Sequence, residues 1–201
     1  MSLISDIILT ANREDKNILI FGSPRSGTHA LGLLFFKEDT DLHLLGEICK
    51  DNPREEIRAF CTENSRKIGQ IVQMSAKLRI SWDIASIRDS SIVVRLRRRN
   101  KVSQFSSWMY SSKVSDNNQW HNYRIQDFVG SRGCIEATQS DIDQFIIEQM
   151  VDSFFVADYE LYYEDIDFSG VKIKRNEYPF DLVEIFSNKD FVIESMSRWG
   201  Y

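Results

Sequence analysis

A segment near the start of the chain combines residue types and spacing that can bind an anion. It reads Gly22-Ser23-Pro24-Arg25-Ser26-Gly27-Thr28-His29, with four residues between its two glycines. In loops of this kind, successive backbone N–H groups and the N-terminus of the following helix converge on a phosphate. The version that binds nucleoside triphosphates carries Lys after the second glycine. Here Thr28 stands in that place, which disfavours ATP chemistry with magnesium, and Arg25 supplies a cation from inside the loop.

A second concentration of positive charge lies in the middle of the chain. Eight Lys and Arg residues stand between Lys77 and Lys101 against two acids, whereas Asp141 to Asp167 holds nine acids and no base. The net charge of the chain is -5, which argues against a general nucleic-acid-binding protein. A local basic cluster in an acidic protein indicates a small anionic ligand that is held in one place.

The segment Pro24 to Thr28 resembles the 5′-phosphosulfate-binding loop of sulfotransferases that use 3′-phosphoadenosine-5′-phosphosulfate (PAPS). Members of that family also carry an Arg after a later strand and a Ser eight residues beyond it, which recognise the 3′-phosphate. Arg99 and Ser107 fit that pattern, and the stretch Tyr159 to Ile166 is a weaker similarity. The resemblance implies a P-loop-like fold with two contacts to PAPS. One would be Arg99 with Ser107, and the other would be the loop residues Ser23, Pro24, Arg25, Ser26, Gly27, Thr28 and His29.

The same resemblance implies catalytic roles. Arg25 matches the loop cation that family members aim at the transferring group, so it would stabilise the leaving group. Glu47 stands where carboxylate-base members place their Glu, and it is the first candidate for the general base. His29 is the rival base because it adjoins the loop and titrates near neutrality. PAPS would be the donor substrate, no metal would be required, and the acceptor would be a hydroxyl or amine of a small molecule or carbohydrate.

The chain also departs from the family. The Arg-Lys-Gly loop that closes over the 3′-phosphate in cytosolic animal members is absent. Lys77 is a further candidate cation for the donor or acceptor site. Acceptor-binding loops would lie at residues 39–50 and 111–133. Four aromatic residues in or beside the second loop could either stack on an acceptor ring or form a satellite core: Trp108, Tyr110, Trp120 and Tyr123.

Two other functions are open. A kinase-like phosphotransferase would bind ATP and depend on magnesium, and the missing Lys after Gly27 counts against it. A non-enzymatic module that binds RNA or DNA through Arg95 to Lys101 would show an affinity that falls steeply with salt. Such a module would be harmed most by neutralising Arg97 and Arg98 together, whereas a sulfotransferase would be harmed most by Arg99→Ala. The acidic balance of the chain counts against nucleic acid as a partner.

The apolar pattern predicts the elements that position these residues. Residues 18–21 form an apolar run that predicts a buried central strand before the loop, and a buried helix follows from Thr28 or His29. Further strands are predicted at residues 71–74, 92–96 and 159–163. Helices are predicted at residues 78–87, 100–112 and 141–155, with one or two short helices in the tail at 180–199. This alternation predicts a three-layer α/β/α fold with a central, mostly parallel sheet.

Polar residues predict where two of these helices begin. Asn52 is expected to cap a helix that Pro53 starts, with Glu55 reaching back in a capping box. The inner face of that helix would include Ile57, Phe60 and Cys61. Ser140 is expected to cap the long helix from Asp141, whose buried stripe would be Ile142, Phe145, Ile146, Met150 and Phe154.

Length and composition predict one globular domain over residues 1–201. The 201 residues are 42% hydrophobic and 27% charged, which excludes a disordered or fibrous protein. The three cysteines lack the spacing of a disulfide framework or a zinc site, which favours a reducing, cytoplasmic setting. The chain has no apolar run of the roughly 20 residues that cross a membrane and no signal-peptide pattern at its start. We therefore expect a soluble protein without a membrane partner, and no expectation follows for its oligomeric state.

Overall fold

The computed structural model describes residues 2–48, 52–62, 66–72, 77, 84–113, 133–169, 171 and 181–201. The chain groups into two compact units, and each is described by itself. The first unit comprises Met1–Arg97 and Glu148–Ile173, and the second comprises Arg98–Ile147 and Lys174–Tyr201. A single domain over residues 1–201 stays a prediction.

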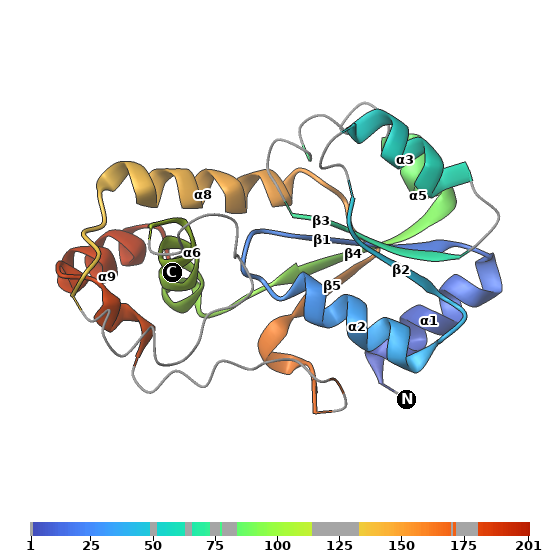
Figure 1. Cartoon of the computed structure of the whole chain (residues 1–201), viewed down its shortest axis with the longest axis horizontal. Coiled ribbons are helices and arrows are strands. Elements are labelled where there is room, and N and C mark those ends of the chain that lie inside the picture. Colours follow the sequence, from blue (N-terminus) through green and yellow to red (C-terminus); the bar gives the residue numbers. More distant parts are fainter. Residues whose placement is uncertain are drawn as a thin grey trace. The chain divides into compact units, whose positions relative to one another are not determined.

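The first unit is built on a five-stranded sheet (Figure 1). Its strands are β1 (Asn17–Gly22), β2 (His43–Glu47), β3 (Lys67–Ile71), β4 (Ser91–Arg97) and β5 (Tyr159–Tyr162), in the order β2-β3-β1-β4-β5. Every neighbouring pair is parallel, so the carboxyl ends of all five strands meet at one edge. β1 lies in the centre and is buried along its whole length, as its apolar run predicts.

Helices cover both faces of the sheet, which confirms the predicted three-layer α/β/α fold (Figure 1). α1 (Leu3–Glu14) and α2 (Thr28–Glu38) cover one face, and α3 (Pro53–Thr62) and α5 (Ile84–Ser90) cover the other. The end of α8 (Gln139–Ser153) also packs on this second face. Alternate strand residues face opposite layers. Ile18, Ile20, Ile92 and Val94 pack with α1 and α2, whereas Leu19, Phe21 and Val93 pack with α3, α5 and α8.

The predicted set of elements lacks α1 and β2. The sequence does carry a signal for α1, because Ile4, Ile7, Ile8 and Ala11 recur at helical spacing and are buried. β2 gives a weaker signal, because it is a short edge strand that alternates between exposed and half-buried residues. The predictions of β1, α2, β4 and β5 are confirmed.

The strand predicted at residues 71–74 is wrong in position, because β3 ends at Ile71. Lys67 and Gln70 make the true strand look exposed in the sequence, yet each is only 2% exposed. The Lys67 Nζ donates a hydrogen bond to the carbonyl of Ala59 at 3.1 Å, and the Lys67 N–H donates to Asn17 Oδ1 at 2.9 Å. Hydrogen bonds of this kind allow a polar side chain to be buried.

The capping box of α3 uses a different acid from the one predicted. Asn52 precedes the helix as expected, but its N–H donates to Glu56 Oε1 at 2.9 Å. Glu56 therefore takes the role that the sequence assigned to Glu55. Ile57 and Phe60 are buried on the inner face as predicted, so the error concerns the cap alone.

The long helix α8 also starts from a different cap and turns a different face inward near its end. Thr138 caps it instead of Ser140, because the Asp141 N–H donates to Thr138 Oγ1 at 3.2 Å and the Thr138 N–H donates to Asp141 Oδ2 at 2.8 Å. Of the predicted stripe, Met150 and Phe154 are exposed, at 50% and 74%. The stripe shifts because α8 passes from the core of the second unit to that of the first. Ile142, Phe145 and Ile146 pack in the core of the second unit, and Val151 packs in the core of the first unit.

The second unit is helical in its described part. α6 (Lys101–Lys113), residues 139–147 of α8, the 3-10 helix η3 (Leu182–Ile185) and α9 (Lys189–Arg198) surround one apolar core. The Phe105 ring stacks on Phe186 with centroids 5.5 Å apart and meets Phe145 edge to face at 5.3 Å. Trp108 and Tyr110 belong to this core, which favours the satellite-core interpretation for them. The predicted acceptor residues Trp120 and Tyr123 lie outside the described residues.

The described helices include none that is long and apolar enough to cross a membrane.

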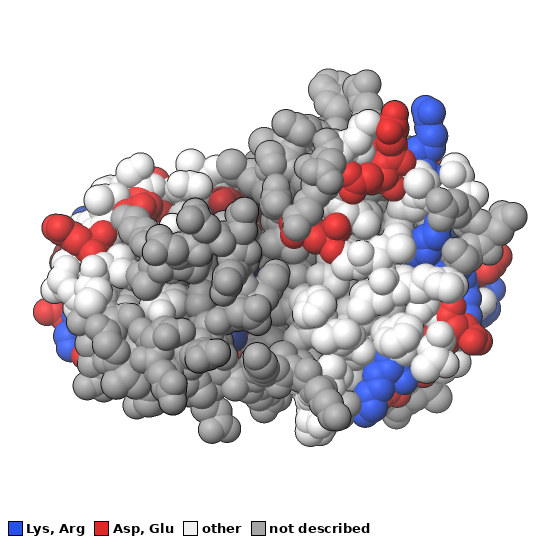
Figure 2. Space-filling view, viewed as in Figure 1, with Lys and Arg blue, Asp and Glu red and all other residues white. Residues whose placement is uncertain are grey.

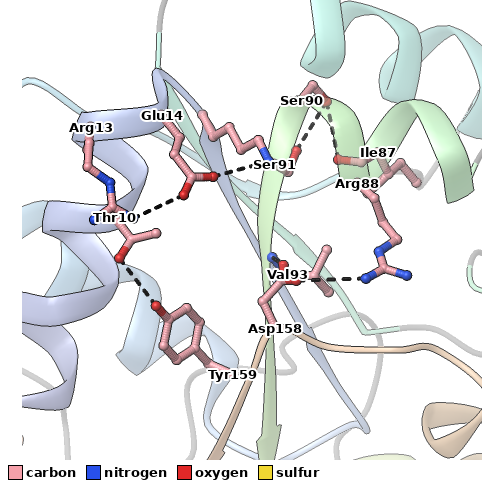
Figure 3. A network of polar contacts seen from close by, with 11 residues as sticks. Thr10, Arg13, Glu14, Ile87, Arg88, Ser90, Ser91, Val93, Asp158 and Tyr159 are labelled. Atoms are coloured by element: carbon pink, nitrogen blue, oxygen red, sulfur yellow. Dashed lines mark hydrogen bonds and ion pairs between the residues drawn. The ribbon is translucent and has the colours of Figure 1, made fainter.

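The edge strand β5 is fastened to the rest of the first unit by polar contacts at its start (Figure 3). Asp158 accepts from the Val93 N–H at 2.7 Å, and the Asp158 N–H donates to the Val93 carbonyl at 2.8 Å. The Tyr159 hydroxyl lies 3.2 Å from Thr10 Oγ1 of α1. These contacts hold β5 in parallel register with β4.

Further along β5, Glu160 binds two arginines of β4 and should make stability depend on pH. Burial raises its pKa, but the hydrogen bond from Arg95, the charge of Arg97 and the hydrogen bond from Tyr162 outweigh it and hold the pKa below 4.5. A pKa that is lower in the folded than in the unfolded chain gives stability that is present above pH 4.5 and is lost as pH falls through the folded value. We expect Glu160→Gln to lose less of its free energy of unfolding than the wild type between pH 7 and about pH 3.

The measurement is urea unfolding at both pH values. The control is Glu38→Gln, at the exposed end of α2, which should keep the wild-type pH dependence. Equal pH dependence in Glu160→Gln and the wild type would contradict the assignment.

Candidate functional site

The glycine loop joins the carboxyl end of β1 to the first turn of α2. Arg25 (φ 64°) and Gly27 (φ 99°) have left-handed backbone, and Ser26 between them does not. The Ser26 N–H donates to the Ser23 carbonyl at 3.1 Å, which closes the turn. Positive-φ residues that alternate with negative-φ residues aim successive N–H groups toward one side, where they can bind an anion. The loop thus has the backbone geometry that an anion site requires.

The N-terminus of α2 adds positive potential at the end of the loop. Gly27 is the N-cap, and in the described chain no side chain caps this helix. The N–H groups of a first helical turn have no partner within the helix, and together they carry a partial positive charge. Thr28 is buried in this turn, and His29 is exposed. An anion at this position would therefore meet backbone donors from both the loop and the helix.

The left-handed backbone of Arg25 is unusual for a residue with a side chain. Such a conformation costs about 1–2 kcal/mol, and glycine would avoid that cost. Residues held in unfavourable backbone regions cluster at functional loops. The retention of an arginine here is consistent with a functional need for its charge.

Close contacts leave no room for a side chain at either glycine of the loop. A Cβ on Gly27 would lie 2.6 Å from Cε2 of Tyr163, whose ring stacks on Phe168 at a centroid distance of 4.8 Å. A Cβ on Gly22 would collide with the Oγ of Ser26. Ser26 is 1% exposed, and its hydroxyl has no hydrogen-bond partner in the described structure. A buried donor without a partner inside the loop is a candidate contact for a bound anion.

A buried network anchors the start of the loop. The Ser23 hydroxyl donates to Asp152 Oδ2, and the Lys77 Nζ donates to Asp152 Oδ1. The Lys77 Nζ also donates to the Gly22 carbonyl at 2.9 Å. Ser23, Lys77 and Asp152 are 1%, 1% and 4% exposed, so water hardly reaches these contacts. Asp152 belongs to α8 and Lys77 lies between β3 and α5, so two segments that are far from the loop in sequence form hydrogen bonds with its start.

Opposing effects act on the charge of Lys77. Burial lowers its pKa, whereas the carboxylate of Asp152 and the charges of Glu148 and Glu47 raise it, and the net result is a lowered pKa. Without these carboxylates, burial would lower the pKa further. Of the three carboxylates, Asp152 has the largest effect on Lys77 and Glu47 the smallest.

Glu47 is the last residue of β2, at the same sheet edge as the glycine loop. Leu44 pairs with Ile68 and Glu47 pairs with Gln70, with an extra residue, Leu45, in a β-bulge between them. Gln70 lies on the α2 face, because its Nε2 is 2.6 Å from the position of a Cβ on Gly32. Directly paired residues share a face. The bulge thus places the half-buried Glu47 on the face that carries α2.

The two residues expected to bind a 3′-phosphate belong to the second unit. Arg99 is exposed just before α6, and Asn100 caps this helix by accepting from the Ser103 N–H at 2.9 Å. Ser107 is 4% exposed on α6. The structure therefore brings together the loop, Lys77 and Glu47 within the first unit. The joint action of this loop with Arg99 and Ser107 stays a prediction.

The neighbouring arginines of β4 have other partners. Arg95 Nη1 donates to Glu160 Oε2 at 3.0 Å, and Arg97 Nε lies 3.3 Å from the same oxygen. Arg97 thus pairs with a residue of the acidic segment between Asp141 and Asp167. On the face that Figure 2 shows, the described Lys and Arg side chains of the first unit are scattered among acidic and uncharged ones. The ion pairs with Glu160 lower the net positive charge that Arg95 and Arg97 could offer to a nucleic-acid backbone.

Sequence interpretation missed two residues of this site. Asp152 was one acid among the nine of an acidic segment, and its signal is that it falls on the buried side of α8. Tyr163 belongs to a stretch expected to mark the end of a strand, and it does follow β5 in a short 3-10 helix. Its packing against Gly27 could not be read from spacing, because the two residues are far apart in the chain.

No group of three or more His, Cys, Asp or Glu side chains in the described ranges could hold a metal ion. Comparisons of the chain with protein-family models, with curated proteins and with solved structures find no match.

The contact between Gly27 and Tyr163 predicts a large loss of stability for Gly27→Ala. The substitution must displace the Tyr163 ring and also places a side chain at φ 99°. Gly46→Ala is a matched control, because Gly46 has φ 76° but a Cβ there meets nothing within 4 Å. We expect Gly46→Ala to cost about 1–2 kcal/mol of the free energy of unfolding, and Gly27→Ala to cost clearly more. Urea unfolding measures both, and equal losses would refute the contact.

Proposed function

We propose that this chain is a sulfotransferase that transfers a sulfonate group from PAPS to a hydroxyl or amine of a small molecule or carbohydrate. The observation that carries the proposal is the glycine loop. It combines alternating positive-φ residues, an α2 N-terminus without a side-chain cap in the described chain, and an arginine inside the loop. Thr28 stands where those loops carry Lys, so the loop lacks the lysine expected for ATP.

In the proposed reaction the acceptor oxygen or nitrogen attacks the sulfur of PAPS in line with the leaving group. A bond forms between the acceptor atom and sulfur, and the bond between sulfur and the bridging oxygen of the 5′-phosphosulfate breaks. The electron pair of that bond stays on the oxygen, and adenosine 3′,5′-bisphosphate leaves. Arg25 stabilises the charge on this oxygen, and the loop N–H groups hold the 5′-phosphate. Catalysis comes from positioning and from these fixed charges, without a required metal.

Glu47 is the proposed general base that takes the proton of the acceptor. Its place at the carboxyl end of β2, on the α2 face and within the electrostatic influence of Lys77, supports a position beside the loop. His29 is the weaker candidate, because its side chain is exposed on α2. Arg99 and Ser107 are proposed to bind the 3′-phosphate, which distinguishes PAPS from other adenine nucleotides.

Calorimetry with adenosine 3′,5′-bisphosphate tests the donor site. We expect the wild type to bind it and to prefer it over ATP with magnesium. Arg25→Gly should weaken binding by about 10- to 100-fold, because a charge-assisted hydrogen bond contributes about 1.5–3 kcal/mol. It should not lower the free energy of unfolding, because glycine relieves the left-handed strain. Arg99→Ala should weaken binding similarly, whereas Arg97→Ala, which loses an ion pair to Glu160, should not. Preference for ATP with magnesium would favour a kinase-like enzyme and defeat the proposal.

Glu47→Gln tests the base. With an acceptor found by screening sugars, phenols and amines, we expect its kcat to fall by about 10²–10⁴-fold because proton removal is lost. Its affinity for adenosine 3′,5′-bisphosphate should not change, because the donor does not need the base. His29→Gln should retain most of the activity. A large loss in His29→Gln together with an active Glu47→Gln would transfer the role to His29.

A further inference from the structure

Ser23, Lys77 and Asp152 form a buried network that the proposed reaction does not use. We infer that Asp152 and Lys77 act as positioning residues, which fix the start of the glycine loop and thereby set its affinity for the anionic end of PAPS. The inference rests on the proposed function for the identity of the ligand. It rests on the hydrogen bonds of the network for the mechanism.

The Ser23 hydroxyl is engaged by the protein in this structure. A hydroxyl has one proton to donate, and the proton of Ser23 is donated to Asp152 Oδ2. This changes the expectation for Ser23, which resemblance alone places on PAPS. The Ser23 side chain fixes the start of the loop. In the same loop, the buried hydroxyl of Ser26 has no hydrogen-bond partner among the described residues.

Lys77 is likewise committed to the protein. Its Nζ donates to the Gly22 carbonyl at 2.9 Å and to Asp152 Oδ1, and the residue is 1% exposed. Gly22 is the last residue of β1, so this bond fixes the point from which the loop departs. Lys77 was a candidate for direct contact with donor or acceptor, and its contacts assign it to the support of the loop instead.

A buried ion pair is a poor device for stability alone. Removing two charges from water is costly, and apolar residues of similar size often stabilise a fold as well or better. What the pair supplies here is a fixed orientation, because the Asp152 carboxylate accepts hydrogen bonds from two segments, through Ser23 and Lys77. Backbone N–H groups that bind an anion need fixed positions, since a displacement of about 1 Å can lower activity about 100-fold.

Four variants test the inference. Asp152→Asn keeps the shape but weakens both hydrogen bonds, and Ser23→Ala removes one of them. The double variant Lys77→Met with Asp152→Leu removes both charges of the ion pair together. Lys67→Met is the matched control, because Lys67 is also a buried lysine that donates to a backbone carbonyl, that of Ala59, but lies at the start of β3 rather than at its carboxyl end.

The readouts are the Kd for adenosine 3′,5′-bisphosphate, the Kd for inorganic pyrophosphate and the midpoint of urea unfolding. We expect Asp152→Asn to weaken both ligands by about 10-fold or more, and Ser23→Ala to weaken them less. The double variant should regain much of the unfolding midpoint that Asp152→Asn loses, yet bind as weakly as Asp152→Asn. Lys67→Met should lose stability and keep both Kd values within about twofold of the wild type.

The outcomes separate the inference from the proposed function. Asp152→Asn and the double variant with wild-type Kd values for both ligands would overturn the inference. So would a Kd that merely follows the unfolding midpoint across all variants, because that would make the network purely structural. A wild-type chain that binds pyrophosphate but not the bisphosphate would defeat the sulfotransferase proposal, and the pyrophosphate Kd values would still decide the role of Asp152.

Discussion

Parallel pairing of β1 with β3 on one side and β4 on the other is the constraint on which the rest of the structure depends. Gly22 pairs with Leu96 and Phe21 pairs with Ile71, so the segments that follow these three strands leave the sheet at one edge. The chain runs from β1 toward β2 on one side and from β4 toward β5 on the other. Open α/β sheets bind ligands at such a change of direction. The glycine loop lies at this point, and every other feature of the site is arranged around it.

The chemistry of the loop resides mainly in its backbone, and the surrounding side chains define that backbone. Tyr163 packs where a side chain on Gly27 would lie, and the Asp152 carboxylate accepts a hydrogen bond from the Ser23 hydroxyl at the start of the loop. The site therefore combines two kinds of support, one apolar and one ionic. Because Tyr163 and Asp152 both lie after position 150, the conformation of a loop near the start of the chain depends on segments that are far from it in sequence.

The sequence predicted the parts of this arrangement that are local. The apolar run of β1, the spacing of the loop and the start of α2 are adjacent in the chain, so their order alone indicates a strand, an anion loop and a helix. The three-layer fold followed from the alternation of such units. The position of β3 did not, because Lys67 looks exposed until its hydrogen-bond partners Ala59 and Asn17 are known.

The site was predicted less completely for the same reason. Glu47 is a candidate because a family pattern points to it, although the strand that carries it was not predicted. Asp152 was missed because its partners, Ser23 and Lys77, come from two other parts of the chain. The exposure of Met150 and Phe154 was not predicted. Helical spacing does not reveal that residues at the start of α8 pack in one core and residues at its end pack in another.

The bulge at Leu45 bears on how a carboxylate like Glu47 can be found in other chains. Leu45 has no partner on β3, so a chain without that residue could keep the pairs of Leu44 with Ile68 and Glu47 with Gln70 unchanged. The number of residues that separates the glycine loop from the carboxylate is therefore free to vary by one while their arrangement in space is conserved. An alignment that counts from the loop would select the wrong residue in such a chain, whereas the pairing partner on β3 would identify the right one.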